Sequence, residues 1–193
     1  MTRRDIRLAA EGFLKEHHAA LSIPVPIEKI LEIKLGVEVR PLPGLYKIYA
    51  RNGILLSSGR VIAVDNDDFE SNQTRLRFTL AHELGHILLH KDHIDSVSLD
   101  DVAQAWKQYN GIAAETLGDM ERDASYFAGH ILVPQARLIG ELGKARQRLL
   151  NVHGLDITGK GRDVRDVVAK AIADAFDVSP NVVSRRLEEE GLP

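Results

Sequence analysis

The chain of 193 residues contains no cysteine. It can therefore form no disulfide bond and offer no thiolate to a metal ion, which suits a protein of the reducing cytoplasm. Any zinc site in this protein must be built from histidine and carboxylate side chains.

The sequence also has no long apolar run and no large excess of either charge. No stretch approaches the length of a transmembrane helix, and the mixed charges that follow the first residues do not resemble a signal peptide. The formal net charge of −3 provides no overall basic field that would draw the protein to nucleic acid or a membrane. We expect a cytoplasmic globular protein of one domain, or of one domain with a small appendage.

The apolar pattern predicts an α+β protein, with helices at helical spacing and strands between turn residues. The predicted helices are 4–19, 27–35, 71–90, 117–132, 135–150, 163–176 and 181–190. The predicted strands are 37–41, 45–50, 53–56 and 60–64. Because Asn52-Gly53 favours a hairpin, we expect a small antiparallel sheet of three to four strands.

Two stretches between these elements are less regular. The polar residues 92–116 contain either a helix over 100–109 or a loop over a functional site. Residues 151–161 predict a glycine-containing loop. Ser71 or Asn72 is placed to cap the helix that runs to about residue 90.

Residues 82–86 read His-Glu-Leu-Gly-His, which is the H-E-x-x-H pattern. On a helix, His82 and His86 lie one turn apart on the same face and can bind one Zn²⁺ together. Glu83 then lies beside the open coordination position, where it can act as the general base. The alternative of two surface histidines fits poorly, because the motif lies in an apolar run where unpartnered imidazoles are costly. Gly85 within this helix predicts a close approach by another element.

A catalytic zinc site usually has a third protein ligand. The metzincin continuation H-E-x-x-H-x-x-G-x-x-H fails, because Leu89 and Asp92 stand where it requires glycine and histidine. A carboxylate from the next buried helix is the better source. The acidic residues there are Glu115, Asp119, Glu121 and Asp123. Spacing favours Glu121 only modestly, and Ser125, one turn later, could hydrogen-bond a ligand histidine.

Two segments together resemble the ImmA/IrrE family of zinc metallopeptidases. They are R-F-T-L-A-H-E-L-G-H-I-L-L-H and E-R-D-A-S-Y-F-A-G-H-I-L-V-P. In that family the second segment typically reads E-x-x-A-N-x-F-A-x-x-L-L-M-P, and its leading glutamate is the third zinc ligand, which the resemblance assigns to Glu121. The chain departs from this pattern in Ser125 for asparagine, in Val133 for methionine, and in Gly129-His130, where small apolar residues are common.

The resemblance implies a minimal zincin-like fold of the gluzincin kind. We expect a metallopeptidase domain over 1–134 and a C-terminal helical, helix-turn-helix-like region over 135–193. The implied activity is that of an intracellular zinc-dependent endopeptidase. Members of the family act on helix-turn-helix transcriptional repressors in stress responses or on mobile elements, so the expected partner is such a repressor.

The expected chemistry needs more than the metal ligands. Zn²⁺ held by His82, His86 and Glu121 would polarise a carbonyl, with Glu83 as the base. The developing oxyanion requires a second stabilising group. The candidates, which the sequence does not separate, are His90, His93, His130, Tyr109 and Tyr126. A peptide substrate can bind as an added strand, for which we expect residues 60–64 to provide the edge.

The C-terminal helices have the spacing of a helix-turn-helix, and the candidate DNA contacts are Asn181, Ser184, Arg185 and Arg186. Against DNA binding, the run 188–190 is all glutamate and would repel phosphate. In addition, Asp177 replaces the usual glycine of the turn. The resemblance implies docking or positioning of the substrate instead. The alternative function is a DNA- or partner-binding regulator with a structural or sensory zinc site, but such a site needs no base at Glu83.

Overall fold

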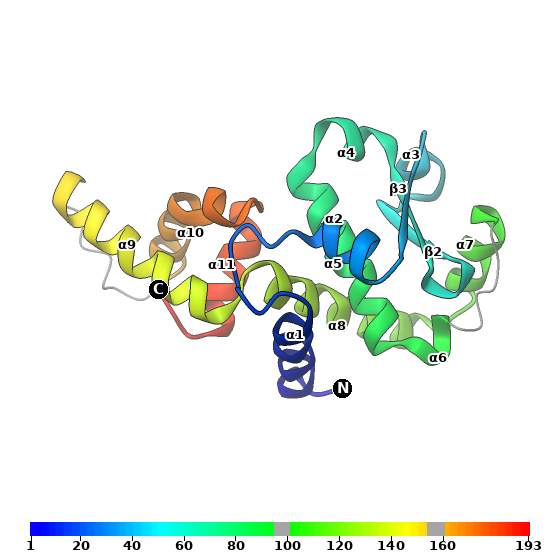
Figure 1. Cartoon of the computed structure of the whole chain (residues 1–193), viewed down its shortest axis with the longest axis horizontal. Helices are drawn as coiled ribbons and strands as arrows, with labels where there is room; N and C mark the ends of the chain where they lie inside the picture. The colour runs from blue at the N-terminus through cyan, green and yellow to red at the C-terminus, as the bar shows by residue number, and fades with distance from the viewer. Residues whose placement is uncertain (95–100, 154–160) are drawn as a thin grey trace.

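The structure, a computed structural model of the chain, describes residues 1–94, 101–153 and 161–193. Over these residues it is a mostly helical α+β protein with a small three-stranded sheet, which confirms the predicted fold class. The elements are α1 (Arg3–His17), α2 (Ile27–Lys29), the π-helical turn η1 (Ile30–Lys34), β1 (Glu38–Leu42), α3 (Leu45–Tyr49), β2 (Gly53–Leu56), the 3₁₀ turn η2 (Ser57–Gly59), β3 (Val61–Asp65), α4 (Asn66–Ser71), α5 (Gln73–Leu89), α6 (Lys91–Ile94), α7 (Val102–Asn110), α8 (Ala114–Leu132), α9 (Gln135–His153), α10 (Arg162–Phe176) and α11 (Pro180–Glu189). Figure 1 shows the sheet with α3 and α7 at one end of the molecule and α9 to α11 at the other, with α8 between them.

Side chains at the helix starts satisfy backbone groups that the helices leave unpaired. Thr2 and Asp5 form a capping box at the start of α1. Asn72 caps α5 by accepting a hydrogen bond from the backbone N–H of Arg75, so the cap predicted at Ser71 or Asn72 is Asn72. Part of the predicted helix 100–109 and of the predicted loop 151–161 lies outside the described residues. Helix α7 confirms the helical alternative for 102–109, whereas the loop prediction is wrong at its start, because α9 continues to His153.

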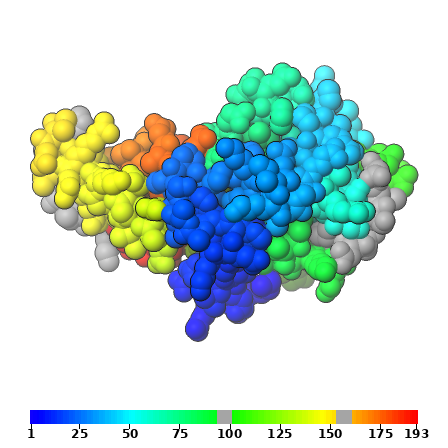
Figure 2. Space-filling model, in the orientation of Figure 1, coloured from blue at the N-terminus to red at the C-terminus, as the bar shows by residue number. Residues whose placement is uncertain are grey.

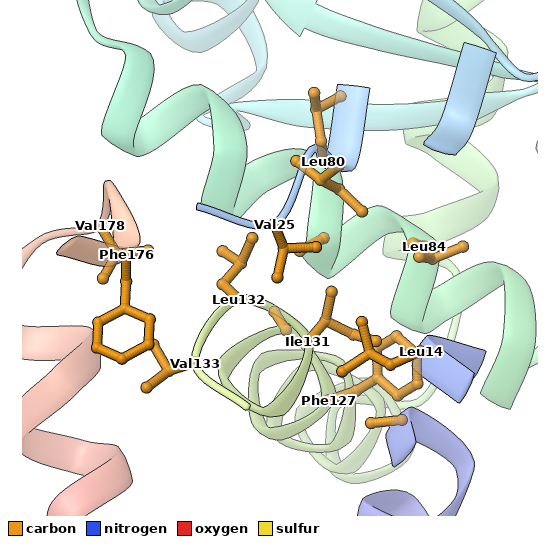
Figure 3. Packing of buried hydrophobic residues seen from close by; sticks show 14 of the residues in the cluster. Leu14, Val25, Leu80, Leu84, Phe127, Ile131, Leu132, Val133, Phe176 and Val178 are labelled. Atoms are coloured by element: carbon orange, nitrogen blue, oxygen red, sulfur yellow. The ribbon is translucent and has the colours of Figure 1, made fainter. Parts of the chain in front are cut away.

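One large hydrophobic core joins the helices. Figure 3 shows Leu14 of α1, Leu80 of α5, Phe127 of α8 and Phe176 of α10 within this packed cluster. The N-terminal stretch crosses the middle of the visible face in Figure 2. Residues on both sides of position 134 contribute to the core, and the division into 1–134 and 135–193 stays a prediction.

The sheet is mixed, so the expectation of a wholly antiparallel sheet was wrong. Its strand order is β1-β3-β2, and β3 pairs parallel with β1 and antiparallel with β2. The expected substrate edge at residues 60–64 is therefore also wrong, because β3 has a partner on both sides. Within the described residues, β1 and β2 are the edge strands of the sheet.

Residues 45–50, which were expected to form a strand, instead form α3. The helix begins after Gly44 and ends at Ala50, both in the left-handed region. Leu45 is buried, whereas Tyr46 and Ile48 are exposed, so the apolar residues do not alternate between two faces. Asn52-Gly53 consequently connects α3 to β2, and the hairpin lies one connection later, between β2 and β3.

The turn between α10 and α11 is fastened to the motif helix. Asp177 adopts the left-handed conformation at the end of α10, at the position where a helix-turn-helix usually has glycine. The guanidinium of Arg77 on α5 is buried, donates to the backbone carbonyl of Asp177, and forms ion pairs with Glu28 and Asp177. This arrangement fixes the C-terminal helices relative to α5.

Candidate metal centre

Helices α5 and α8 bring together His82, His86 and Glu121, which we call the candidate metal site. Each offers one ligand atom, and these atoms all lie within 4.8 Å of one another. The Nε2 atoms of His82 and His86 are 3.1 Å apart, and Oε2 of Glu121 is 3.2 Å from Nε2 of His82. Of the other acids considered, Glu115 and Asp119 are exposed, and Asp123 faces the N-terminal amine.

The two helices pack closely enough for this because of Gly85. A Cβ atom there would lie 3.0 Å from Cα of Ala124 on α8, a contact that real side chains avoid. The close approach predicted from Gly85 is therefore confirmed. Any larger residue would separate the histidines on α5 from the carboxylate on α8.

The electrostatics of the site suit a cation. Burial lowers the pKa of His86 to about 2, so this imidazole is neutral. Burial alone would raise the pKa of Glu121, but hydrogen bonds and opposite charges from His82 and Arg51 outweigh it and lower the pKa to about 2. A neutral imidazole and an ionised carboxylate thus lie beside His82, and two imidazoles with one carboxylate are a donor set that zinc accepts.

Each residue of the candidate metal site has a further polar partner, as metal ligands usually do. Oγ of Ser125 lies 3.3 Å from Nδ1 of His82, which agrees with the contact expected for Ser125. Nδ1 of His90 lies 3.1 Å from Nδ1 of His86. The guanidinium of Arg51 donates to Oε1 of Glu121 over 2.7 Å, which leaves Oε2 beside Nε2 of His82.

Glu83 lies beside this group and is 7% exposed. Burial raises its pKa to about 7, although the opposite charge of His82 acts against the rise. A Cβ atom on Gly53 would lie 2.8 Å from Oε1 of Glu83, so the start of β2 lies directly against this carboxyl. Glu83 also lines a small cavity of about 20 Å³ together with Arg51, Tyr109 and Glu121, room for about one water molecule.

Two residues near the site come from outside the motif segments. Helix α7 carries Tyr109, whose hydroxyl lies 3.1 Å from Nε2 of His86. Arg51 stacks over the Tyr109 ring at 5.1 Å and was not anticipated from the sequence. Arg51 precedes the turn residues Asn52-Gly53, and nothing in the local sequence predicts that the Arg51 side chain contacts α8.

The other oxyanion candidates are divided between two places. His90 contacts His86, as described above, and His93 lies on the exposed α6. His130 and Tyr126 lie at the far end of α8, where their rings pack 4.5 Å apart. Tyr109 is thus the candidate that combines a hydroxyl donor with direct contact to the candidate metal site.

The buried side chains of His130 and Arg186 belong to a second polar group, which we call the Arg186 cluster. Its members are Arg186, His130, Glu189, Glu190 and Gln135. Arg186 is 1% exposed and binds the carboxylates of Glu189 and Glu190. A Cβ atom on Gly129 would lie 3.1 Å from Cδ of Arg186, so the unusual Gly129-His130 pair makes room for this side chain and faces it.

The four candidate DNA contacts have different surroundings. Arg186 is buried in its cluster, and the hydroxyl of Ser184 donates to Asp166 of α10. Asn181 and Arg185 instead line a large cleft that also includes Glu121. The exposed groups of α11 therefore face the same cleft as the candidate metal site.

An H-E-x-x-H helix whose two histidines meet a glutamate from the next buried helix defines a site of the metallopeptidase class. The chain belongs to the ImmA/IrrE metallopeptidase family: the family model described as the IrrE N-terminal-like domain, peptidase family M78, matches residues 34–188. A search of curated proteins found no match to the chain. None of the helices within the described residues is long and apolar enough to cross a membrane.

Proposed function

We propose that the protein is a zinc-dependent endopeptidase of the cytoplasm that cleaves a helix-turn-helix transcriptional repressor and so relieves repression. The observation that carries this proposal is the convergence of ligand atoms from His82, His86 and Glu121 beside the buried carboxyl of Glu83. Membership of the ImmA/IrrE metallopeptidase family supports the reaction type and the choice of zinc. The repressor, in a stress response or on a mobile element, is inferred from the family alone.

These three residues would hold Zn²⁺, which when bound would supply a Lewis acid able to polarise the scissile carbonyl and to lower the pKa of a water molecule. Glu83 accepts the proton of the attacking water and passes it to the nitrogen of the leaving amine.

The side chains opposite Glu83 stabilise the charge that develops on the substrate. The hydroxyl of Tyr109, next to His86, donates to the oxyanion. Arg51 holds Oε1 of Glu121 and adds positive charge to the same small cavity. The extended substrate passes the start of the edge strand β2, because Gly53 lies against Glu83 and is half-buried, whereas Ile54, Leu55 and Leu56 are buried.

The test compares wild type, Glu83→Gln and Glu70→Gln on a helix-turn-helix repressor encoded next to the protein's own gene. Glu83→Gln should retain zinc and the wild-type melting temperature, but cleave at least about 100-fold more slowly. Glu70→Gln, an exposed position on α4, should behave as wild type. Wild-type cleavage by Glu83→Gln would overturn the mechanism. Zinc-dependent binding of the repressor or of operator DNA, with no cleavage by any of the three, would support the alternative regulator.

A further inference from the structure

We propose that the large cleft between α1 and α11 binds an acidic segment of the protein substrate, with Arg3 and Arg185 as its recognition residues. The inference rests on the proposed peptidase function, because it adds the chemistry of the substrate that the site receives. It concerns residues remote from the H-E-x-x-H motif.

The cleft has a volume of about 1300 Å³, and Glu121 of the candidate metal site is one of its lining residues. Ser125 of α8 also lines it. Arg3 of α1 and Asn181 and Arg185 of α11 line the same cleft. A polypeptide that reaches Glu121 through this cleft therefore lies on a surface that carries both arginines.

The acidic side chains that line the cleft are all paired with cations, whereas two of its arginines form no ion pair within the described residues. Each of its four lining carboxylates forms an ion pair with a cation of the protein. The pairs are Glu121 with Arg51, Asp123 with the N-terminal amine, Glu188 with Arg165, and Glu189 with Arg186. Arg3 and Arg185 have no ion pair with any residue in the described part of the chain, and Arg3 instead lies over the ring of Tyr126 at 5.5 Å. The charge available to a ligand is thus positive, which favours carboxylate side chains.

The wall that carries Arg185 is rigidly held. The next residue, Arg186, is buried and bound to α8 through His130 and the carbonyl of Val133. Behind α11, Arg77 fixes Asp177 in the preceding turn. Because its backbone is fixed on both sides, Arg185 is presented at a set distance from the candidate metal site, as a specificity residue requires.

A protein segment fits this cleft better than nucleic acid does. Duplex DNA carries one negative charge for about every 1.7 Å of its axis, which is far more charge than the two uncommitted arginines of this cleft can meet. A peptide with separate acidic residues can place them at Arg3 and Arg185 and leave neutral residues beside the carboxylates.

The experiment measures binding without cleavage, using the zinc-loaded Glu83→Gln protein. The probe is a fluorescein-labelled Gly-Glu repeat of 12 residues, compared by anisotropy with a Gly-Lys repeat and a labelled DNA duplex. The Gly-Glu probe should bind best, and Arg3→Glu and Arg185→Glu should each weaken it at least about fivefold. Arg148→Glu, an exposed arginine on α9 that does not line the cleft, should change its affinity less than twofold.

The outcomes separate this inference from the peptidase proposal. An unchanged Gly-Glu affinity in both charge-reversal variants, or tighter binding of the Gly-Lys probe to the parent protein, would overturn the inference. Arg185-dependent binding of the duplex in preference to the Gly-Glu peptide would also overturn it. If the Gly-Glu probe binds as expected but no repressor is cleaved, the acidic-ligand cleft stands and only the proposed peptidase function fails.

Discussion

Helix α8 contributes to two polar groups of similar composition, the candidate metal site and the Arg186 cluster. Both combine imidazole with carboxylate and lie at a contact between α8 and another helix. In the Arg186 cluster the positive charge is part of the chain: a guanidinium that is 1% exposed binds two glutamates. In the candidate metal site, the ligand atoms of His82, His86 and Glu121 converge on one another instead.

Imidazole and carboxylate side chains therefore stabilise a helix contact in the Arg186 cluster and form a candidate ligand set in the metal site. A buried carboxylate needs a charged or hydrogen-bonding partner. Where the partner is an internal arginine, the group is complete and holds α11 to α8. At the candidate metal site Arg51 donates only to Oε1 of Glu121. The other carboxylate oxygen and the imidazole nitrogens can therefore bind a metal ion. The following variants test whether the two groups differ in this way.

The largest expected effect on folding is that of Arg186→Met. The substitution leaves Glu189, Glu190 and His130 without their common partner, and breaking a buried ion pair typically costs about 3–5 kcal/mol. Urea unfolding measures it, and the loss should be the same with and without zinc. The neighbouring exposed residue gives a matched control, since Arg185→Met should change the free energy of unfolding by less than about 0.5 kcal/mol. Equal effects of the two substitutions would show that the Arg186 cluster does not stabilise the fold.

Glu121→Ala should weaken zinc binding strongly and change the free energy of unfolding little. Removing a ligand should weaken zinc binding by more than the 10- to 100-fold, about 1.4–2.7 kcal/mol, that is typical of outer partners. The free energy of unfolding without metal should change less than in Arg186→Met. Zinc content after purification and competition with a chelator measure the affinity, with Glu115→Ala, an exposed glutamate on the same helix, as the control. Undiminished zinc content in Glu121→Ala would show that the third ligand is another residue.

The sequence predicted the parts of the site that short-range patterns encode. One turn of helix places His82, Glu83 and His86. Gly85 within that turn correctly predicted the close contact with α8. Glu121 was preferred because of a resemblance, and the structure places it with the histidines. By contrast, Arg51 reaches Glu121 across a sequence separation of 70, and no local pattern encodes such a contact.

The same limit explains the errors in the fold. The apolar run at residues 45–50 is compatible with either a strand or a helix, and its environment decides: the carboxylate of Asp65 accepts a hydrogen bond from the backbone N–H of Tyr46 at the start of α3. Once this segment is helical, β1 and β3 are separated by a crossover and can run parallel. Gly129-His130 looked anomalous for a comparable reason, since its partner Arg186 lies on another helix, 56 residues from His130.

Arg51→Ala tests whether the candidate metal site depends on its own cation. Without the guanidinium, Oε1 of Glu121 loses its donor and the carboxylate is free to rotate away from the histidines. Zinc affinity should fall about 10- to 100-fold, and Arg51→Lys should restore part of it through a single charged hydrogen bond. Arg60→Ala, at an exposed position beside β3, serves as the control in a chelator competition assay. A rise in zinc affinity in Arg51→Ala would show instead that Arg51 competes with the metal.

The smallest effect concerns the neutral imidazole of the Arg186 cluster. Burial, reinforced by the charge of Arg186, lowers the pKa of His130 from 6.5 to about 3. Between these two values the unfolded chain binds a proton that the folded protein does not, so stability falls as the pH drops below about 6.5 and is unaffected by this group above it. The loss is at most about 1.4 kcal/mol per pH unit, or about 2 kcal/mol at pH 5. In urea unfolding at pH 7 and pH 5, His130→Gln should therefore lose less stability than wild type by up to this amount. An identical pH dependence in wild type and His130→Gln would mean that His130 is protonated within the Arg186 cluster, and the two groups on α8 would then differ less in charge than their geometry indicates.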